Sequence, residues 1–484
     1  MKKHMSMGRL SLVGALLAVL LCSVTATAAD GTQAQAMCPL NGWQENLVNY
    51  LKPTAAFPTQ DTRTQPTPDC LFHEWSWEAF VWATALNKQG VPRFMELPTL
   101  SDLHTGKGKV GPHPLVLATR MHTLLGEPGF KEGTGAIVEA DGNMLVAPNG
   151  YPVYASVHMN PSYFATAQKN LVATGGYANP KNEGDYFKVG AAVFKATWLR
   201  VDKDHPAPAG AYTTQAQVPI LVQRGTGLLG SVTVEPGGKT TMATVALVGL
   251  HVVGVTENHP EFLWATFEHK GNSPRTPDNT FSTSLAPSPT NYTFYQAGTP
   301  YANVNCVNLP GQQACPAPLT VLSFDEKTQR FSPANNVVLE NRTGGENDKD
   351  GPTNIDNLNK SGQSFFSGVG GAQGTFAHYD LIGTVWLAPN FYVEKNKPEI
   401  LKTSLRTVAI GSVNLANATA ETFVQYPTNT DMKKVQNCFM CHRASSPGGD
   451  LPKRLVAISH ALEYGSQYAV QNQVVIPVGL PPNQ

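Results

Sequence analysis

Charged residues are scarce in this sequence. Only 14% of its 484 residues are charged, and 35 basic residues are balanced by 35 acidic ones. No block of lysine and arginine is present, and a positive surface of that kind is what nucleic acid binding requires. We therefore expect no nucleic-acid partner.

Long apolar runs are also scarce. The one clear run, residues 10–22, follows Lys2, Lys3 and Arg9 and is too short to span a bilayer as a mature helix. The small residues Ala26-Thr27-Ala28 come shortly after it. This order is typical of a secretory signal peptide. We expect residues 1–29 to be removed, and the mature chain to be periplasmic or secreted and to have no membrane span.

Several catalytic fingerprints are missing. The sequence contains no Gly-x-Ser-x-Gly, no phosphate-binding glycine loop and no dinucleotide-binding glycine pattern. These absences argue against an α/β-hydrolase and against a nucleotide-dependent enzyme.

Glycine and proline, by contrast, are abundant, with 43 and 37 residues. This composition favours a fold rich in strands and loops over a helical bundle. Aromatic and apolar residues at helical spacing predict a helix over 71–86. Runs of β-branched and apolar residues predict strands, at 189–201, 218–223, 230–234, 240–256, 262–267, 381–387 and 407–413. Polar stretches at about 272–303 and 341–374 are predicted to be long loops.

The most specific motif lies near the end of the sequence and reads Cys438-Phe439-Met440-Cys441-His442. In a C-x-x-C-H motif, two thiols one helical turn apart add to the two vinyl groups of one haem. The histidine that follows is then directed at the iron. A zinc site would need further Cys or His pairs at ligand spacing, and none is nearby. The motif predicts one covalent haem c, bound by Cys438 and Cys441, with His442 on the iron as proximal ligand.

The motif also divides the chain. We expect a large strand-rich domain over residues 30–426 and a short helical haem-attachment segment over 427–484 that packs on it. The fold class predicted is therefore α+β and strand-rich, with a mixed β domain, an N-terminal helix and a C-terminal helical segment.

Four of the seven cysteines lie outside both the signal peptide and the haem motif. In an oxidising compartment they are expected to form disulfides, and three pairings are possible. We favour Cys38–Cys70 and Cys306–Cys315, because each closes a short local loop.

The sixth ligand of the iron is not specified by the motif. No methionine follows Met440, so a ligand pair of histidine and downstream methionine is excluded. The candidates left open are His460, His251, His269, His378, His73, Met121 and Met159. His460 is close in sequence and lies on a predicted helix, whereas His251 lies in an apolar strand.

Three residues are weak candidates for acid–base roles at an open iron site. They are His251, His269 and the neighbouring Glu268, which would carry protons if it were buried near the iron. Lys195 offers a further, thinly supported possibility of a covalent link to the haem.

Short segments along most of the mature chain resemble a bacterial group known as "cytochrome c family protein". The segments that carry the resemblance are Trp77-Glu78-Ala79-Phe80-Val81, Lys195-Ala196-Thr197-Trp198, Val248-Gly249-Leu250-His251-Val252, Trp264-Ala265-Thr266-Phe267-Glu268-His269, Gly383-Thr384-Val385-Trp386, Leu415-Ala416-Asn417-Ala418-Thr419-Ala420-Glu421-Thr422 and the haem pentad. The resemblance implies an exported single-haem protein and supplies no catalytic residue.

Two functions are compatible with these features. The first is electron transfer by a six-coordinate haem, with a protein redox partner. The second is a haem-dependent oxidoreductase, peroxidase-like or similar in arrangement to cytochrome P460-like oxidases, acting on a small molecule. A haem-bearing sensor or binding module is a third possibility, indicated only by the long loops.

Overall fold

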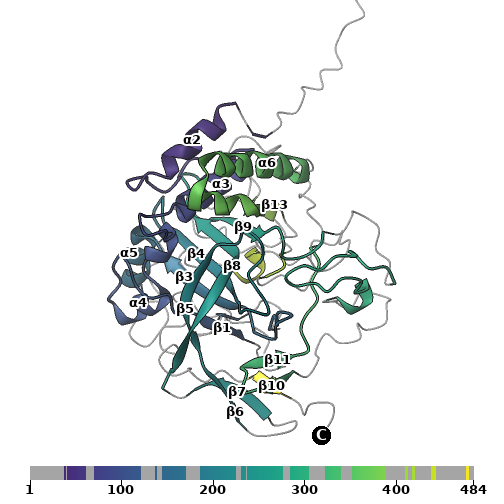
Figure 1. Ribbon diagram of the computed structural model, residues 1–484. Coiled ribbons are helices and arrows are strands. Elements are labelled where there is room, and N and C mark those ends of the chain that lie inside the picture. Colours follow the sequence, from purple (N-terminus) through teal and green to yellow (C-terminus); the bar gives the residue numbers. More distant parts are fainter. Residues whose placement is uncertain are drawn as a thin grey trace, which may run out of the picture. The chain divides into compact units, whose positions relative to one another are not determined.

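The structure is a computed structural model in which a large β-sheet carries a layer of helices (Figure 1). It describes residues 38–39, 41–61, 70–121, 137–138, 144–170, 186–224, 230–235, 237–275, 284–304, 322–339, 351–387, 409–412, 417–419, 438–442 and 476–478. All of these lie in the unit Cys38–Gln484, which is separate from Met1–Met37.

The helices are α2 (Trp43–Tyr50), α3 (Cys70–Thr84), α4 (Leu100–Thr105), α5 (Pro161–Asn170), α6 (Gly351–Val369) and α7 (Cys438–Cys441), with 3-10 turns η1 (Arg93–Glu96), η3 (Tyr301–Asn303) and η4 (Gly371–His378). The strands are β1 (Ala118–Met121), β2 (Ile137–Val138), β3 (Tyr154–Met159), β4 (Ala192–Arg200), β5 (Thr213–Pro219), β6 (Leu221–Arg224), β7 (Gly230–Val234), β8 (Thr240–Gly254), β9 (Leu263–His269), β10 (Ser323–Asp325), β11 (Arg330–Ser332), β12 (Tyr379–Leu387), β13 (Ala409–Gly411) and β14 (Ile476–Val478). The predicted α+β, strand-rich fold class is confirmed.

Among the described residues, the largest sheet has nine strands in the order β13-β12-β9-β8-β4-β3-β1-β2, and β5 also pairs with β8. All its pairs are antiparallel except β1 with β2. The central strand β8 has 15 residues, of which many are β-branched or apolar. One edge of β8 pairs with β4 over residues 245–254. The other edge pairs with β5 over residues 240–246 and with β9 over residues 249–254.

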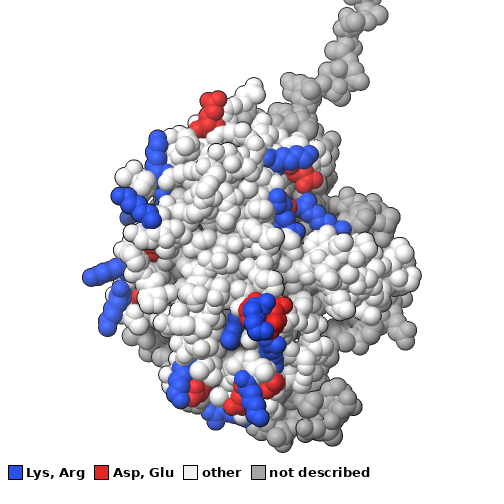
Figure 2. Space-filling model, in the orientation of Figure 1, with Lys and Arg blue, Asp and Glu red and all other residues white. Residues whose placement is uncertain are grey.

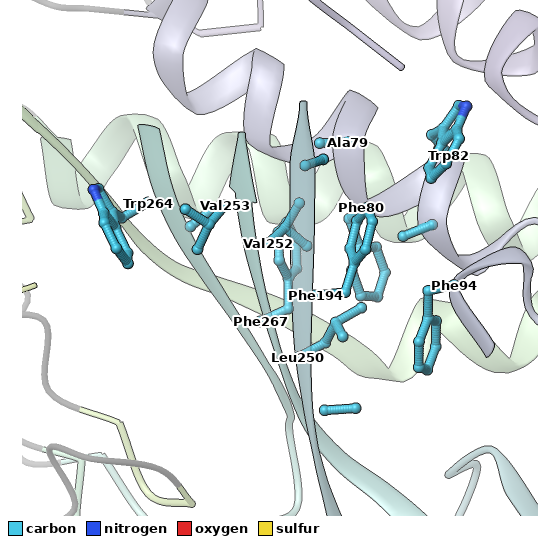
Figure 3. Packing of buried hydrophobic residues seen from close by; sticks show 14 of the residues in the cluster. Ala79, Phe80, Trp82, Phe94, Phe194, Leu250, Val252, Val253, Trp264 and Phe267 are labelled. Carbon is cyan, nitrogen blue, oxygen red and sulfur yellow. The ribbon is translucent and has the colours of Figure 1, made fainter. Parts of the chain in front are cut away.

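Helix α3 covers one face of this sheet. The ring of Phe80 stacks on Phe267 of β9 with 4.1 Å between centroids, and Trp77 also contacts Phe267. Figure 3 shows Phe80, Phe194 and Phe267 grouped beneath the helix, whereas Trp264 and Val253 lie apart from them. Side chains alternate between the two faces of a strand. The contact between Phe267 and α3 therefore shows which residues of β9, and of the strands paired with it, face α3.

The predicted disulfide between Cys38 and Cys70 is present, with Cα atoms 5.4 Å apart. It ties the segment before α2 to the first residue of α3. Cys306 and Cys315 lie outside the described residues.

The long loop predicted at 341–374 is wrong from residue 351 onward, and residues 341–350 lie outside the described residues. Residues 351–369 form α6, and residues 371–378 form η4. Ile355, Leu358 and Phe366 recur at helical spacing and are fully buried, and this apolar stripe was hidden by the polar residues around it. The other predicted loop, 272–303, has only the short turn η3 at its end among its described residues.

Charged side chains are few on the face seen in Figure 2, and both signs are scattered between wide neutral areas. Within the described segments, no helix combines the length and apolar character that a bilayer span requires.

Candidate functional site

The Cys438–His442 motif forms a single helical turn that is anchored on β9. Residues Cys438–Cys441 make up α7, and the His442 N–H donates to the Cys438 carbonyl oxygen at 2.9 Å, which continues the turn through the histidine. Phe439 is 1% exposed, and its ring lies 6.0 Å from that of Trp264. The His442 imidazole lies 4.3 Å from the Trp264 ring. Cys438 is half-buried, and the side chain of Cys441 lies outside the described residues.

Trp264 belongs to the face of the sheet that is opposite α3, which we call the His251 face. It is made by β3, β4, β8, β9 and β12, and cross-strand pairing arranges its residues in three rows. The Trp264 row contains Met159, Val193, Val253, Trp264 and Val385; the His251 row contains Val157, Lys195, His251, Thr266 and Gly383; the Glu268 row contains Ala155, Thr197, Gly249, Glu268 and Asp380.

The His251 row is polar and only partly covered. Lys195 and His251 are half-buried, although most residues of β4 and β8 around them are fully buried. His251 Nδ1 lies 2.7 Å from Thr266 Oγ1, and this hydrogen bond fixes the orientation of the imidazole ring. The row thus places an oriented histidine one strand away from Trp264 and the residues of the motif.

A second C-terminal segment, residues 417–419, covers the Glu268 row. The Ala418 N–H donates to Glu268 Oε1 at 2.5 Å, and Thr197 Oγ1 donates to Thr419 Oγ1 at 3.2 Å. Gly249 leaves room for this contact, because a Cβ atom there would lie 2.5 Å from Thr419 Oγ1. The motif therefore contacts one outer row and residues 417–419 contact the other, with the His251 row between them. Four residues along a strand separate the outer rows, which corresponds to roughly 13 Å.

Glu268 is held in its neutral form at neutral pH. Burial raises the pKa of Glu268 to about 8, and the nearby Asp380 carboxylate acts in the same direction. Hydrogen bonds from Ala418 and Asn272, and the Arg275 guanidinium, oppose that rise. The neighbouring Asp380 is itself paired with Arg275 and with the Gln363 amide, and burial raises its pKa as well. Glu268 is thus a buried proton donor in the row beside the His251 row.

His269 has a different environment from its neighbour Glu268. Its Nε2 donates to the Ala209 carbonyl oxygen at 3.1 Å, and its Nδ1 accepts from the Gly271 N–H at 3.1 Å. Burial lowers its pKa to about 4, so the ring is neutral. Both ring nitrogens are hydrogen-bonded to the backbone. His269 therefore has a structural role, in which it stabilises a turn of the chain.

The remaining predicted candidates are dispersed. His73 is buried on α3 with its Nδ1 3.2 Å from Thr384 Oγ1, on the opposite face of the sheet. His378 lines a cavity of about 840 Å³ together with His205 and His269, and this cavity includes no residue of the three rows. Met159 is fully buried at the far end of the Trp264 row. The side chain of Met121 and all of His460 lie outside the described residues.

The residues of this site fit a haem bound through the motif. The helical turn joins Cys438 and His442 through a backbone hydrogen bond, and the Trp264 ring lies beside the imidazole. Between the motif and residues 417–419 lies a partly covered row with an oriented histidine. Among the described residues, no three His, Cys, Asp or Glu side chains group in the manner of a separate metal site.

Sequence reasoning did not identify Thr266 as the partner of His251, or Trp264 as the residue that supports His442. Alternation along each strand places Trp264, Thr266 and Glu268 on one face. The register that sets Thr266 opposite His251 is a long-range property that no local pattern reveals. Comparison with family models, curated proteins and solved structures found no match to this chain.

Proposed function

We propose that this chain is an exported monohaem c-type cytochrome that takes part in electron transfer. Cys438 and Cys441 hold the haem, and His442 binds its iron. The observation that carries the proposal is the position of the C-x-x-C-H turn, whose histidine ring lies 4.3 Å from Trp264 at the edge of a partly covered polar row. The haem supplies reversible one-electron redox chemistry when bound.

The chain's own residues have clear roles in such a site. Phe439 anchors the turn in the core, and Trp264 restricts the orientation of the His442 imidazole. Residues 417–419 cover the other end of the face and exclude water from Glu268. These contacts would keep the cofactor in one position, which fast electron transfer to a protein redox partner requires.

The proposed location is periplasmic or extracellular. The signal-like residues 1–29 support export, and the Cys38–Cys70 disulfide is of the kind that persists in an oxidising compartment. Covalent attachment of haem to a C-x-x-C-H motif also takes place outside the cytoplasm.

The experiment is expression of the full chain together with a c-type haem maturation system. We expect a Soret band, one haem added to the polypeptide mass, and an alkaline pyridine spectrum of thioether-bound haem. The double variant Cys438→Ala/Cys441→Ala should lose the covalent cofactor, whereas His378→Gln, which alters a histidine of the separate cavity, should keep it. A wild-type protein without covalent haem would contradict the proposal.

A second candidate function is a haem-dependent oxidoreductase with an open iron site, peroxidase-like or P460-like. The observation that favours it is the group of Lys195, His251 and Thr266 beside Glu268, a proton donor near neutral pH. A small-molecule substrate would then reach this row. High-spin iron that binds carbon monoxide or cyanide readily would favour this function over simple electron transfer.

A further inference from the structure

The histidines with described side chains differ sharply in where they lie. Seven of them are away from the His251 face: His73, His113, His158, His205, His259, His269 and His378. His73 and His158 face the helical layer, where they contact Trp386 and Phe94.

The other five of these histidines also have their contacts away from the His251 face. His259 pairs with Glu261 beside Phe72 of α3, with 2.8 Å between Nδ1 and Oε1. His113 lies within hydrogen-bond distance of the Leu97 and Pro114 carbonyl oxygens. His205, His269 and His378 line the separate cavity. In the described part of the chain, only His251 and His442 therefore remain as histidines of the His251 face.

His251 and Trp264 are close neighbours on that face. Thr266 is the cross-strand partner of His251, and Trp264 lies two residues from Thr266 on β9. Such diagonal neighbours are about 7–8 Å apart between Cα atoms. Since the His442 ring lies against Trp264, the two imidazoles approach the same region of the face from the sheet and from α7.

The orientation of His251 suits an iron ligand. Histidines that bind metals commonly use one ring nitrogen for the metal while the other is held by a hydrogen bond to a neighbouring group. Thr266 Oγ1 engages Nδ1 at 2.7 Å, so a metal would be bound through Nε2. His251 is half-buried, whereas Leu250 and Val252 on either side of it along β8 are buried.

We propose that His251 would be the sixth ligand of the haem iron, bound through its Nε2. This inference rests on the proposed haem and selects one of the ligands that the sequence left open. A bis-histidine iron is six-coordinate and suited to electron transfer.

The test compares the wild-type holoprotein with His251→Gly. The wild-type protein should be low-spin in both oxidation states and unreactive toward carbon monoxide. The variant should become mostly high-spin in the ferric state and bind carbon monoxide in the ferrous state, and added imidazole should restore the low-spin spectrum. His378→Gly is the matched control and should keep the wild-type spectrum.

A second measurement, on the wild-type protein and on His460→Gly, tests the proposal if the His251 variant does not fold. Near-infrared magnetic circular dichroism distinguishes bis-histidine ligation from histidine with lysine or methionine, so it separates His251 from Lys195 and Met159 of the same face. His460 is the other histidine that the sequence left as a candidate ligand. A bis-histidine band in the wild-type protein therefore supports the proposal only if His460→Gly shows the same band.

Two sets of results would overturn the inference. One is a wild-type iron that is high-spin or has a lysine or methionine ligand, and the other is loss of the bis-histidine band in His460→Gly. Covalent haem shown by the pyridine spectrum in the same sample would leave the proposed function standing. Absence of covalent haem would instead contradict the proposed function itself.

Discussion

At the residue scale, the His251 face contains polar groups in a sheet that is otherwise apolar. Glu268 is 3% exposed, and its Oε1 accepts a hydrogen bond from a chain segment about 150 positions away in sequence. A buried carboxyl group in such a setting is neutral unless a cation compensates it, and the Arg275 guanidinium, which opposes the rise in the pKa of Glu268, is already paired with Asp380. The stability of this part of the protein should therefore depend on pH.

We predict that the contribution of Glu268 to stability is largest at acid pH and is lost as pH rises from its ordinary pKa toward about 8. The sign follows from the raised pKa, because the folded state binds the proton more tightly than the unfolded state does. Glu268→Gln keeps the acceptor for Ala418. At a pH well above 8, this variant should melt at a higher temperature than wild type, and its free energy of unfolding should be larger by at least about 1 kcal/mol. Thermal unfolding across pH measures this. Equal pH profiles for the two proteins would contradict it.

A second prediction concerns the hydrogen bond between His251 and Thr266. If His251 binds iron, a proton on Nδ1 donated to Thr266 Oγ1 makes the imidazole a stronger donor to ferric iron, and loss of this bond should raise the reduction potential. Thr266→Val should therefore keep the low-spin spectrum but show a higher potential in a redox titration. Thr384→Val removes the matching bond to His73 on the other face and should leave the potential unchanged. A potential that moves equally in both variants would contradict a ligand role.

At the scale of elements, the sequence predicts regular structure well where one periodic pattern dominates. The helix predicted at 71–86 is α3, and the β-branched run at 240–256 is β8. Helix α6 was missed, because its glycine, asparagine and serine residues are typical of loops. Its formation depends on tertiary contacts, in which the Trp77 indole donates to Asn359 Oδ1 at 3.2 Å. The C-x-x-C-H motif was visible from its spacing alone, but its place beside Trp264 was not, since strand register is decided by the whole sheet.

Two glycines of α6 provide a matched pair of tests for its packing. A Cβ atom at Gly362 would lie 2.6 Å from atoms of the Trp77 ring, so Gly362→Ala should destabilise the fold by roughly 1–3 kcal/mol. Gly368 has no heavy atom within 4 Å of such a Cβ, and Gly368→Ala should stabilise it by roughly 0.4–1 kcal/mol. Denaturant unfolding measures both changes. Opposite signs are expected, and a neutral Gly362→Ala would contradict the close packing.

At the scale of the whole molecule, distant parts of the sequence complete one another. The Cys38–Cys70 disulfide joins the segment before α2 to α3, and Asn354 Oδ1 of α6 accepts the Cys38 N–H at 3.2 Å. The N-terminal helices are thereby fixed to a helix from the second half of the chain, which lies beside the sheet (Figure 1).

We predict that removal of this disulfide destabilises the protein without loss of haem attachment. The bond joins residues separated by 32 positions, and a loop of that length corresponds to about 3–4 kcal/mol. Cys38→Ser/Cys70→Ser should unfold at lower denaturant concentration than wild type while keeping its Soret band. Unchanged unfolding in the double variant would show that α2 and α3 are held by packing alone.

The two segments that contact the outer rows of the His251 face have a consequence for biogenesis. Strands β3 to β9 lie between Tyr154 and His269, whereas the covering residues are 417–419 and 438–442. During synthesis from the N-terminus, these strands emerge long before the segments that cover them. The His251 face of the nascent sheet therefore lacks these two covering segments until the C-terminal part of the chain has been made. Under the proposed function, a chaperone or the haem-attachment machinery would act on the sheet in that interval.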